Sequence, residues 1–192
     1  TSFVGCNGLT KLTTVVLPST VTSIGEYAFS GCMRLESITL PNVTEVGYGA
    51  FSGCSSLKSI ELPMATTLGH YAFQNCENLQ SVKIPAVTEI QEGCFYRCYA
   101  LNDINLSNVQ IIKREAFYDC FALTKVDLSS ATELSSGIFE YCHKLSDVTL
   151  SDELSSIPSS MFYGCDSLTS ITLPSSVLSI GGSTFTGTSL KS

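Results

Sequence analysis

One pattern of apolar and polar positions repeats along the chain, and a cysteine marks each copy. We call these residues the ladder cysteines: Cys6, Cys32, Cys54, Cys76, Cys98, Cys120, Cys142 and Cys165. The sequence spacing between successive ladder cysteines is constant from Cys32 to Cys142. It is longer between Cys6 and Cys32, and it is one residue longer between Cys142 and Cys165. A fixed period of this kind is typical of solenoid proteins, in which one copy forms one coil and cannot bury its apolar face alone.

The apolar positions inside a copy predict its local structure. After Cys32 they fall at Leu35, Ile38, Leu40 and Phe51, and the same offsets recur in the copies that follow. The alternation of residues 37–40 predicts a short, half-buried strand, which the proline at position 41 ends because it has no N–H to donate. Residues 44–46 predict a second short extended piece, and residues 48–52 a single helical or 3-10 turn. The extra residues of the irregular copies, at Asp152 or Glu153 for example, belong to loops.

Two segments carry the repeat in its fullest form, and they identify a family resemblance. LTTVVLPSTVTSIGEYAFSGC and LTSITLPSSVLSIGGSTF resemble the BspA-like leucine-rich repeats, whose pattern is LxxIxLPxxVxxIGxxAFxxCxxL. The resemblance covers essentially the whole chain. It implies a β-rich α/β solenoid, a right-handed leucine-rich-repeat superhelix of about eight coils of 22–23 residues. Short parallel strands would line its concave face, with short helical or 3-10 turns elsewhere.

The family also sets expectations about organisation and role. Its members are mostly large surface or secreted proteins of bacteria and parasitic protists, implicated in adhesion to host matrix proteins or to other microbes. The resemblance carries over no catalytic residue. We expect one solenoid domain over residues 1–192, forming a fragment of a longer chain because the sequence begins within a repeat. We expect an extracellular or cell-surface location.

Composition narrows the possible partners. Only 14% of the residues are charged and 44% are hydrophobic, so the chain is not of the disordered class. A net charge of −7 argues against nucleic acid and against an anionic membrane surface, both of which attract basic patches. The apolar runs are far too short to insert into a membrane.

The cysteine and histidine residues do not form a pattern typical of a catalytic or metal site. The ladder cysteines share one position beside leucine and phenylalanine, which predicts buried free thiols and no cofactor. Cys94 takes a position that is alanine in other copies; with Cys98 it forms C-x3-C, a weak metal signal without a second pair. His70 and His143 lie three coils apart, so no nucleophile–base pair is expected. We expect no metal site and no enzyme.

The outward strand positions are the first candidate for binding. In the middle coils they carry charged and amide side chains instead of serine and threonine, which predicts a polar binding strip on the concave face. The alternative needs no ligand, because Glu61 and Lys83 on adjacent strands would pair, as would Lys125 with Asp103 and Asp147. The strip comprises Glu61, Lys83, Asn105, Asp127, Asp103, Lys125 and Asp147.

A group of aromatic residues near the phenylalanine-to-cysteine turn of three successive coils is the second candidate. Exposed together, these side chains would form a protein or glycan contact; packed on one another outside the core, they would need no partner. They are Tyr96, Tyr99, Tyr118, Phe121 and Tyr141. Sequons at Asn42 and Asn105 carry little weight in a chain rich in serine and threonine.

Two functions from different classes remain open. The first is a non-enzymatic module that binds host matrix or surface proteins, glycans or other cells through its repeat surface, with many weak contacts multiplied by avidity. The second is a structural spacer in a larger surface protein. Neither end of the repeat array has a polar cap, which also allows end-to-end self-association.

Overall fold

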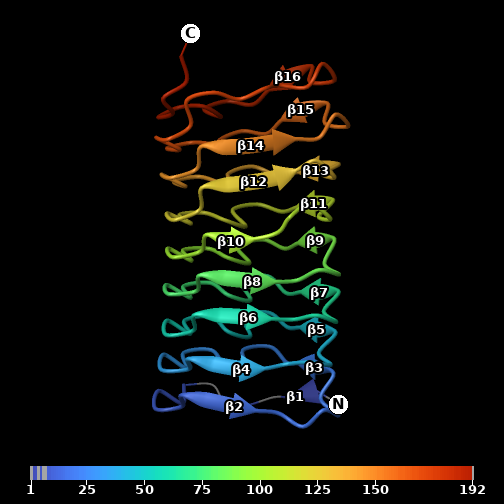
Figure 1. Cartoon of the computed structure of the whole chain (residues 1–192), viewed down its shortest axis with the longest axis vertical. Helices are drawn as coiled ribbons and strands as arrows, with labels where there is room; N and C mark the ends of the chain where they lie inside the picture. Colours follow the sequence, from blue (N-terminus) through green and yellow to red (C-terminus); the bar gives the residue numbers. More distant parts are fainter. Residues whose placement is uncertain (1, 4, 6–7, 192) are drawn as a thin grey trace.

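The computed structural model describes residues 2–3, 5 and 8–191, so the first ladder cysteine, Cys6, lies outside the described residues. The chain forms a stack of about eight coils along one axis, with two rows of short parallel strands (Figure 1). This arrangement confirms the predicted solenoid. Each coil buries its apolar side chains against the coils above and below it.

The first row of strands faces the viewer in Figure 1, and we name it the long-strand face. Its strands pair in parallel with the equivalent strands of the next coil, as in Ser59 opposite Ser81 and Ser81 opposite Asp103. Thr14 pairs with Ser37, and these two partners are one residue further apart in the sequence than the partners of the other two pairs. The additional residue lies in a loop, as expected. The row consists of β2 (Thr14–Val16), β4 (Ser37–Thr39), β6 (Ser59–Glu61), β8 (Ser81–Lys83), β10 (Asp103–Ile104), β12 (Lys125–Leu128) and β14 (Asp147–Leu150).

The second row, the short-strand face, contains the two-residue strands expected from segments such as residues 44–46. They also pair in parallel, as in Glu45 opposite Thr67. The row consists of β1 (Ser2–Phe3), β3 (Ser23–Ile24), β5 (Glu45–Val46), β7 (Thr67–Leu68), β9 (Glu89–Ile90), β11 (Ile111–Ile112), β13 (Glu133–Leu134), β15 (Ser156–Ile157) and β16 (Ser179–Ile180).

Two details of the prediction are wrong. Residues 170–172, at the positions expected for an eighth long strand, are not a strand, and β14 pairs with β12 on its other side. Residues 2–3, 5 and 8–191 also contain no helix, so the expected helical turns are β-turns. The physical reason is the backbone of Tyr27 and Gly31, whose φ angles of 52° and 71° lie in the left-handed region. Both positions recur in every coil through residue 187 and interrupt any right-handed helix.

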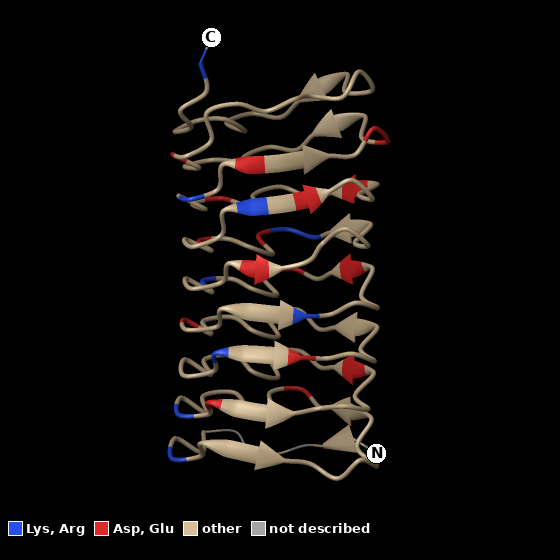
Figure 2. Cartoon of the chain, viewed as in Figure 1, with Lys and Arg blue, Asp and Glu red and all other residues tan. Residues whose placement is uncertain are grey.

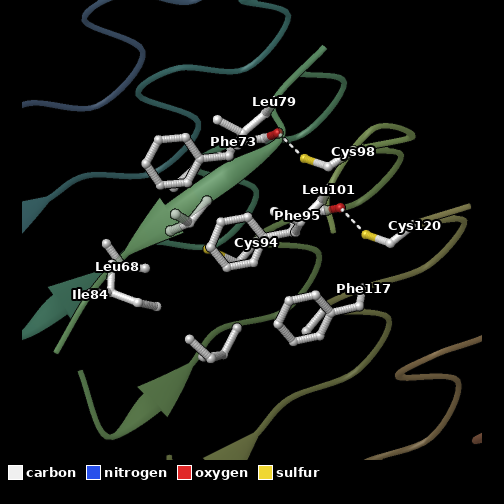
Figure 3. Close-up of a cluster of buried hydrophobic side chains, with 14 of the residues drawn as sticks. Leu68, Phe73, Leu79, Ile84, Cys94, Phe95, Cys98, Leu101, Phe117 and Cys120 are labelled. Atoms are coloured by element: carbon white, nitrogen blue, oxygen red, sulfur yellow. Dashed lines mark hydrogen bonds between the residues drawn. The ribbon is translucent and has the colours of Figure 1, made fainter. Parts of the chain in front are cut away.

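The core is a set of vertical ladders. The Phe73, Phe95 and Phe117 rings are nearly parallel, with centroids 5.5 and 5.3 Å apart (Figure 3). This ring ladder continues from Phe3 to Phe185. Offset stacking of this kind adds to the hydrophobic gain from burying the rings. The outward side chains are therefore presented on a backbone with a regular, well-packed interior.

Candidate functional site

The charged strip lies on the long-strand face, as the sequence predicts, and most of its charges are paired between coils. Figure 2 shows Lys and Arg interspersed with Asp and Glu on this face. The Lys83 Nζ lies 2.5 Å from Glu61 Oε1, and Lys125 Nζ lies 3.4 Å from Asp147 Oδ2. These side chains are about two-thirds exposed, so each pair contributes little to stability. The pairs need no ligand to explain them.

Two other strip residues make local hydrogen bonds. Asn105 Oδ1 accepts a hydrogen bond from the Ser107 N–H at 2.9 Å, and Asp127 Oδ1 accepts one from the Ser129 N–H at 3.0 Å. These are two of the three coils in which serine replaces the proline that ends the strand elsewhere, the third being the coil of Ser151. Serine restores an N–H, and the side chain two residues earlier satisfies it. Asn105 also lies one residue beyond β10, not on the strand as expected.

Asp103 differs from the arrangement expected for it. Strands β10 and β12 belong to separate hydrogen-bonded ladders, and within the described part of the chain Asp103 and Lys125 form no ion pair. Beside the short strand β10 the surface has a hollow of about 280 Å³. Strip residues Lys83, Asp103 and Asn105 contribute to its lining, together with Asn108 and apolar residues of the preceding coil. The structure therefore brings three of the seven strip residues to one hollow.

The predicted aromatic residues lie on a different side of the stack, which we name the turn edge. It is formed in each coil by the residues from six before the ladder cysteine to one after it, such as 92–99. Tyr96 stacks on Tyr118 with ring centroids 4.6 Å apart, and Tyr118 meets Tyr141 edge-on at 5.4 Å. These three pack on one another, as the simpler interpretation predicts. Tyr99 and Phe121 are exposed, the latter by 43%.

Sequence reasoning missed the rest of this aromatic surface. Tyr27, Tyr48 and Tyr71 form a second group of contacting rings, with centroids 5.2 and 5.8 Å apart. Tyr163 and His143 extend the first group, since both contact Tyr141. His143 Nδ1 also lies 2.8 Å from Asp166 Oδ2.

A signal for the missed rings is present in the sequence. The left-handed position five residues before each ladder cysteine alternates between large and small side chains: Tyr27, Gly49, Tyr71, Gly93, Glu115 and Gly137. Each of these tyrosine rings lies over the glycine of the next coil. A Cβ atom at Gly93 would come within 2.3 Å of two ring carbons of Tyr71, so the Tyr71 ring would have to move if residue 93 carried a side chain.

The environment of the tyrosines changes their acidity. Tyr71 donates a hydrogen bond of 2.8 Å from its hydroxyl to Glu92 Oε1, and this bond, together with partial burial, raises the pKa of Tyr71 to about 12. Burial and the nearby hydroxyls of Tyr96 and Tyr141 raise the pKa of Tyr118 to about 12. Both phenols stay neutral and able to donate hydrogen bonds at physiological pH.

The cysteines lie in the core, away from both surfaces. All eight described cysteines are free and buried, which confirms the prediction of buried thiols for seven ladder cysteines and Cys94. Burial raises the pKa of Cys54 and Cys165 to about 12, so their thiols are not poised as nucleophiles. In residues 2–3, 5 and 8–191, no three His, Cys, Asp or Glu side chains gather where they could hold a metal ion. No helix in these residues could span a membrane.

Comparison with known proteins agrees with the coil geometry. Residues 2–108 and 88–192 match the family described as BspA type leucine rich repeat region, in six copies. The chain belongs to the BspA-type leucine-rich repeat family. This membership confirms the resemblance inferred from the repeat pattern. No curated protein matches the chain.

Solved structures of bacterial proteins resemble this BspA-type chain. A leucine-rich repeat protein from Eubacterium ventriosum is 31% identical with a TM-score of 0.60, over 94% of this chain and 44% of that protein. The T. pallidum leucine-rich repeat protein is 30% identical with a TM-score of 0.59, over 88% and 72%. A leucine-rich cell surface protein from Faecalibacterium prausnitzii is 25% identical with a TM-score of 0.51, over 94% and 66%. The chain thus spans less than half of the E. ventriosum protein.

Proposed function

We propose that this BspA-type chain is a non-catalytic binding module of a cell-surface protein and that its turn edge makes the contact. The Faecalibacterium prausnitzii relative, described as a cell surface protein, supports the location. The raised pKa of the buried thiols of Cys54 and Cys165 keeps them protonated at physiological pH, which supports a role without catalysis.

One observation carries the choice of the turn edge. Between residues 24 and 165, six large apolar side chains are exposed, and five of them lie on this edge. Apolar side chains gathered on one face of a soluble protein are typical of contact surfaces, and tyrosine is enriched there. These five residues are Tyr27, Met33, Tyr48, Tyr99 and Phe121.

A structural spacer remains the second candidate, and the long-strand face favours it. The pairs Lys83–Glu61 and Lys125–Asp147 satisfy charges within the stack. A face of this kind keeps a rod soluble and needs no partner.

A binding screen against matrix proteins, glycans and whole cells separates the two functions. The native chain is compared with Tyr99→Ser/Phe121→Ser on the turn edge and with Glu61→Ala/Lys83→Ala/Asp127→Ala on the long-strand face. We expect a partner that the turn-edge variant loses and the long-strand variant keeps. The opposite result would place binding on the long-strand face. The absence of detectable binding by all three proteins would favour the spacer.

A further inference from the structure

The two groups of rings on the turn edge are separated by a gap. Within the described chain, the ring contacts of the group that begins with Tyr27 end at Tyr71, and those of the other group begin at Tyr96. Gly93 lies between them in the fifth coil and is covered by the Tyr71 ring. The aromatic surface is therefore interrupted where the left-handed position of one coil carries no ring.

A surface hollow of about 500 Å³ occupies this gap. Its volume falls within the range of small-molecule sites, roughly 300–1,000 Å³. Three aromatic rings and three planar polar groups line it: Tyr48, Tyr71, Gln74, Tyr96, Arg97 and Glu115.

The polar groups at this hollow are available to a ligand. The side-chain amide of Gln74 has no hydrogen-bond partner among the described residues and offers both a donor and an acceptor. The Arg97 guanidinium lies 5.3 Å from the Tyr96 ring centroid, approaches Asp119 only to 3.9 Å and is about half exposed. Glu115 receives hydrogen bonds from Arg114 at one oxygen, Oε1, and presents a second acceptor.

We propose that this hollow binds a neutral hexopyranose ring of a surface glycan; the inference rests on the binding role proposed above. A hexopyranose presents C–H groups on its ring face and hydroxyls around its rim. The C–H face fits beside the Tyr71 and Tyr96 rings, and the hydroxyls match the donors and acceptors of Gln74, Arg97 and Glu115.

The chemistry of the lining argues against other occupants. An apolar side chain of a protein would remove water from Gln74, Arg97 and Glu115 without replacing their hydrogen bonds. An anionic sugar would meet a chain of net charge −7, in which Arg97 and Arg114 already lie beside carboxylates.

Calorimetric titration with cellohexaose, mannohexaose and galactohexaose tests the proposal. Hexagalacturonic acid serves as the anionic comparison. Because the chain contains no tryptophan, its fluorescence comes from its eight tyrosines, three of which line the hollow, and gives a second readout. We expect saturable binding of at least one neutral hexaose and none of the anionic one.

Tyr71→Gly removes a ring at the hollow without straining the fold, because Tyr71 has a φ of 55° and glycine already takes this position at residues 49 and 93. Ser160→Gly is the matched control, with the same left-handed position, a φ of 54° and no ring at the hollow. We expect Tyr71→Gly to raise the dissociation constant about tenfold or more and Ser160→Gly to leave it unchanged. Gln74→Ala, a change at a half-buried side chain without a partner, should weaken binding as well.

Several results would overturn the glycan site. They are the absence of saturable binding to all three neutral hexaoses, preference for the anionic one, and equal affinity of native chain and Tyr71→Gly. If the screen above still found a protein or cell partner that depends on Tyr99 and Phe121, the binding role would stand while the glycan site failed. If neither the screen nor the hexaose titration detected binding, both the binding role and the glycan site would be refuted.

Discussion

The thiol of Cys98 donates a hydrogen bond to the backbone carbonyl of Phe73 in the preceding coil, with 3.1 Å between Sγ and O (Figure 3). The same oxygen accepts the N–H of Cys76 at 3.2 Å. This relationship recurs at every ladder cysteine from Cys54 to Cys165. The ladder cysteine is therefore a polar link between coils as well as the small apolar residue that the sequence predicts.

Substitution of Cys98 measures this link. Cys98→Ala should lower the free energy of unfolding by about 1–2 kcal/mol, since it removes both the hydrogen bond and packed volume. Cys98→Ser should cost less than Cys98→Ala, because its hydroxyl can donate to the Phe73 carbonyl. Urea unfolding of both variants provides the comparison. A serine variant less stable than the alanine variant would show that the thiol acts only through packing.

The phenylalanine ladder should dominate the stability of single coils. Phe95→Ala should lower the free energy of unfolding by about 3–5 kcal/mol, since this ring is fully buried between Phe73 and Phe117. Phe121→Ala, at an exposed ring, should change it by less than about 1 kcal/mol. Chemical unfolding followed by circular dichroism tests both values. Similar losses for the two variants would contradict the assignment of the core.

Close contact between coils explains glycine at one further position. A Cβ atom at Gly69 would lie 2.5 Å from the carbonyl carbon of Gly47, although Gly69 itself has no left-handed φ. Gly69→Ala should therefore destabilise the protein by about 1–3 kcal/mol through overpacking. Gly182→Ala is the control, since nothing lies within 4 Å of its Cβ position. Thermal melting of the two variants should separate them, and equal melting temperatures would refute the close approach.

Ionisation of Tyr71 should report its bond to Glu92. The pKa of Tyr71, about 12, is above the unfolded value of about 10. Its contribution to stability is thus fully present below pH ~10 and is lost as the pH rises through ~12. Glu92→Gln removes the carboxylate acceptor and should lower the pKa of Tyr71 while leaving that of Tyr118 unchanged. Ultraviolet titration of tyrosinate in both proteins measures the shift, and identical curves would disprove the role of Glu92.

The repeat alone predicted the coil, most of the strand positions and the core. Leu35, Ile38, Leu40 and Phe51 point inward because the apolar offsets leave one arrangement in which every copy buries them against its neighbours. The same reasoning placed the ladder cysteines in the core, and the structure confirms this for the seven that it describes.

Only the tertiary structure decided what the outward side chains do. Their partners lie one coil away along the sequence, so pairing depends on side-chain reach and on local strand registry, which the repeat does not specify. Lys83 reaches Glu61, whereas Asp103 and Lys125 do not meet because β10 and β12 belong to different ladders. Left-handed turns in every coil replaced the expected helical turns and placed the Tyr71 ring over Gly93, leaving the gap before Tyr96. The period is a property of the sequence, and the arrangement of the exposed side chains is a property of how the coils meet.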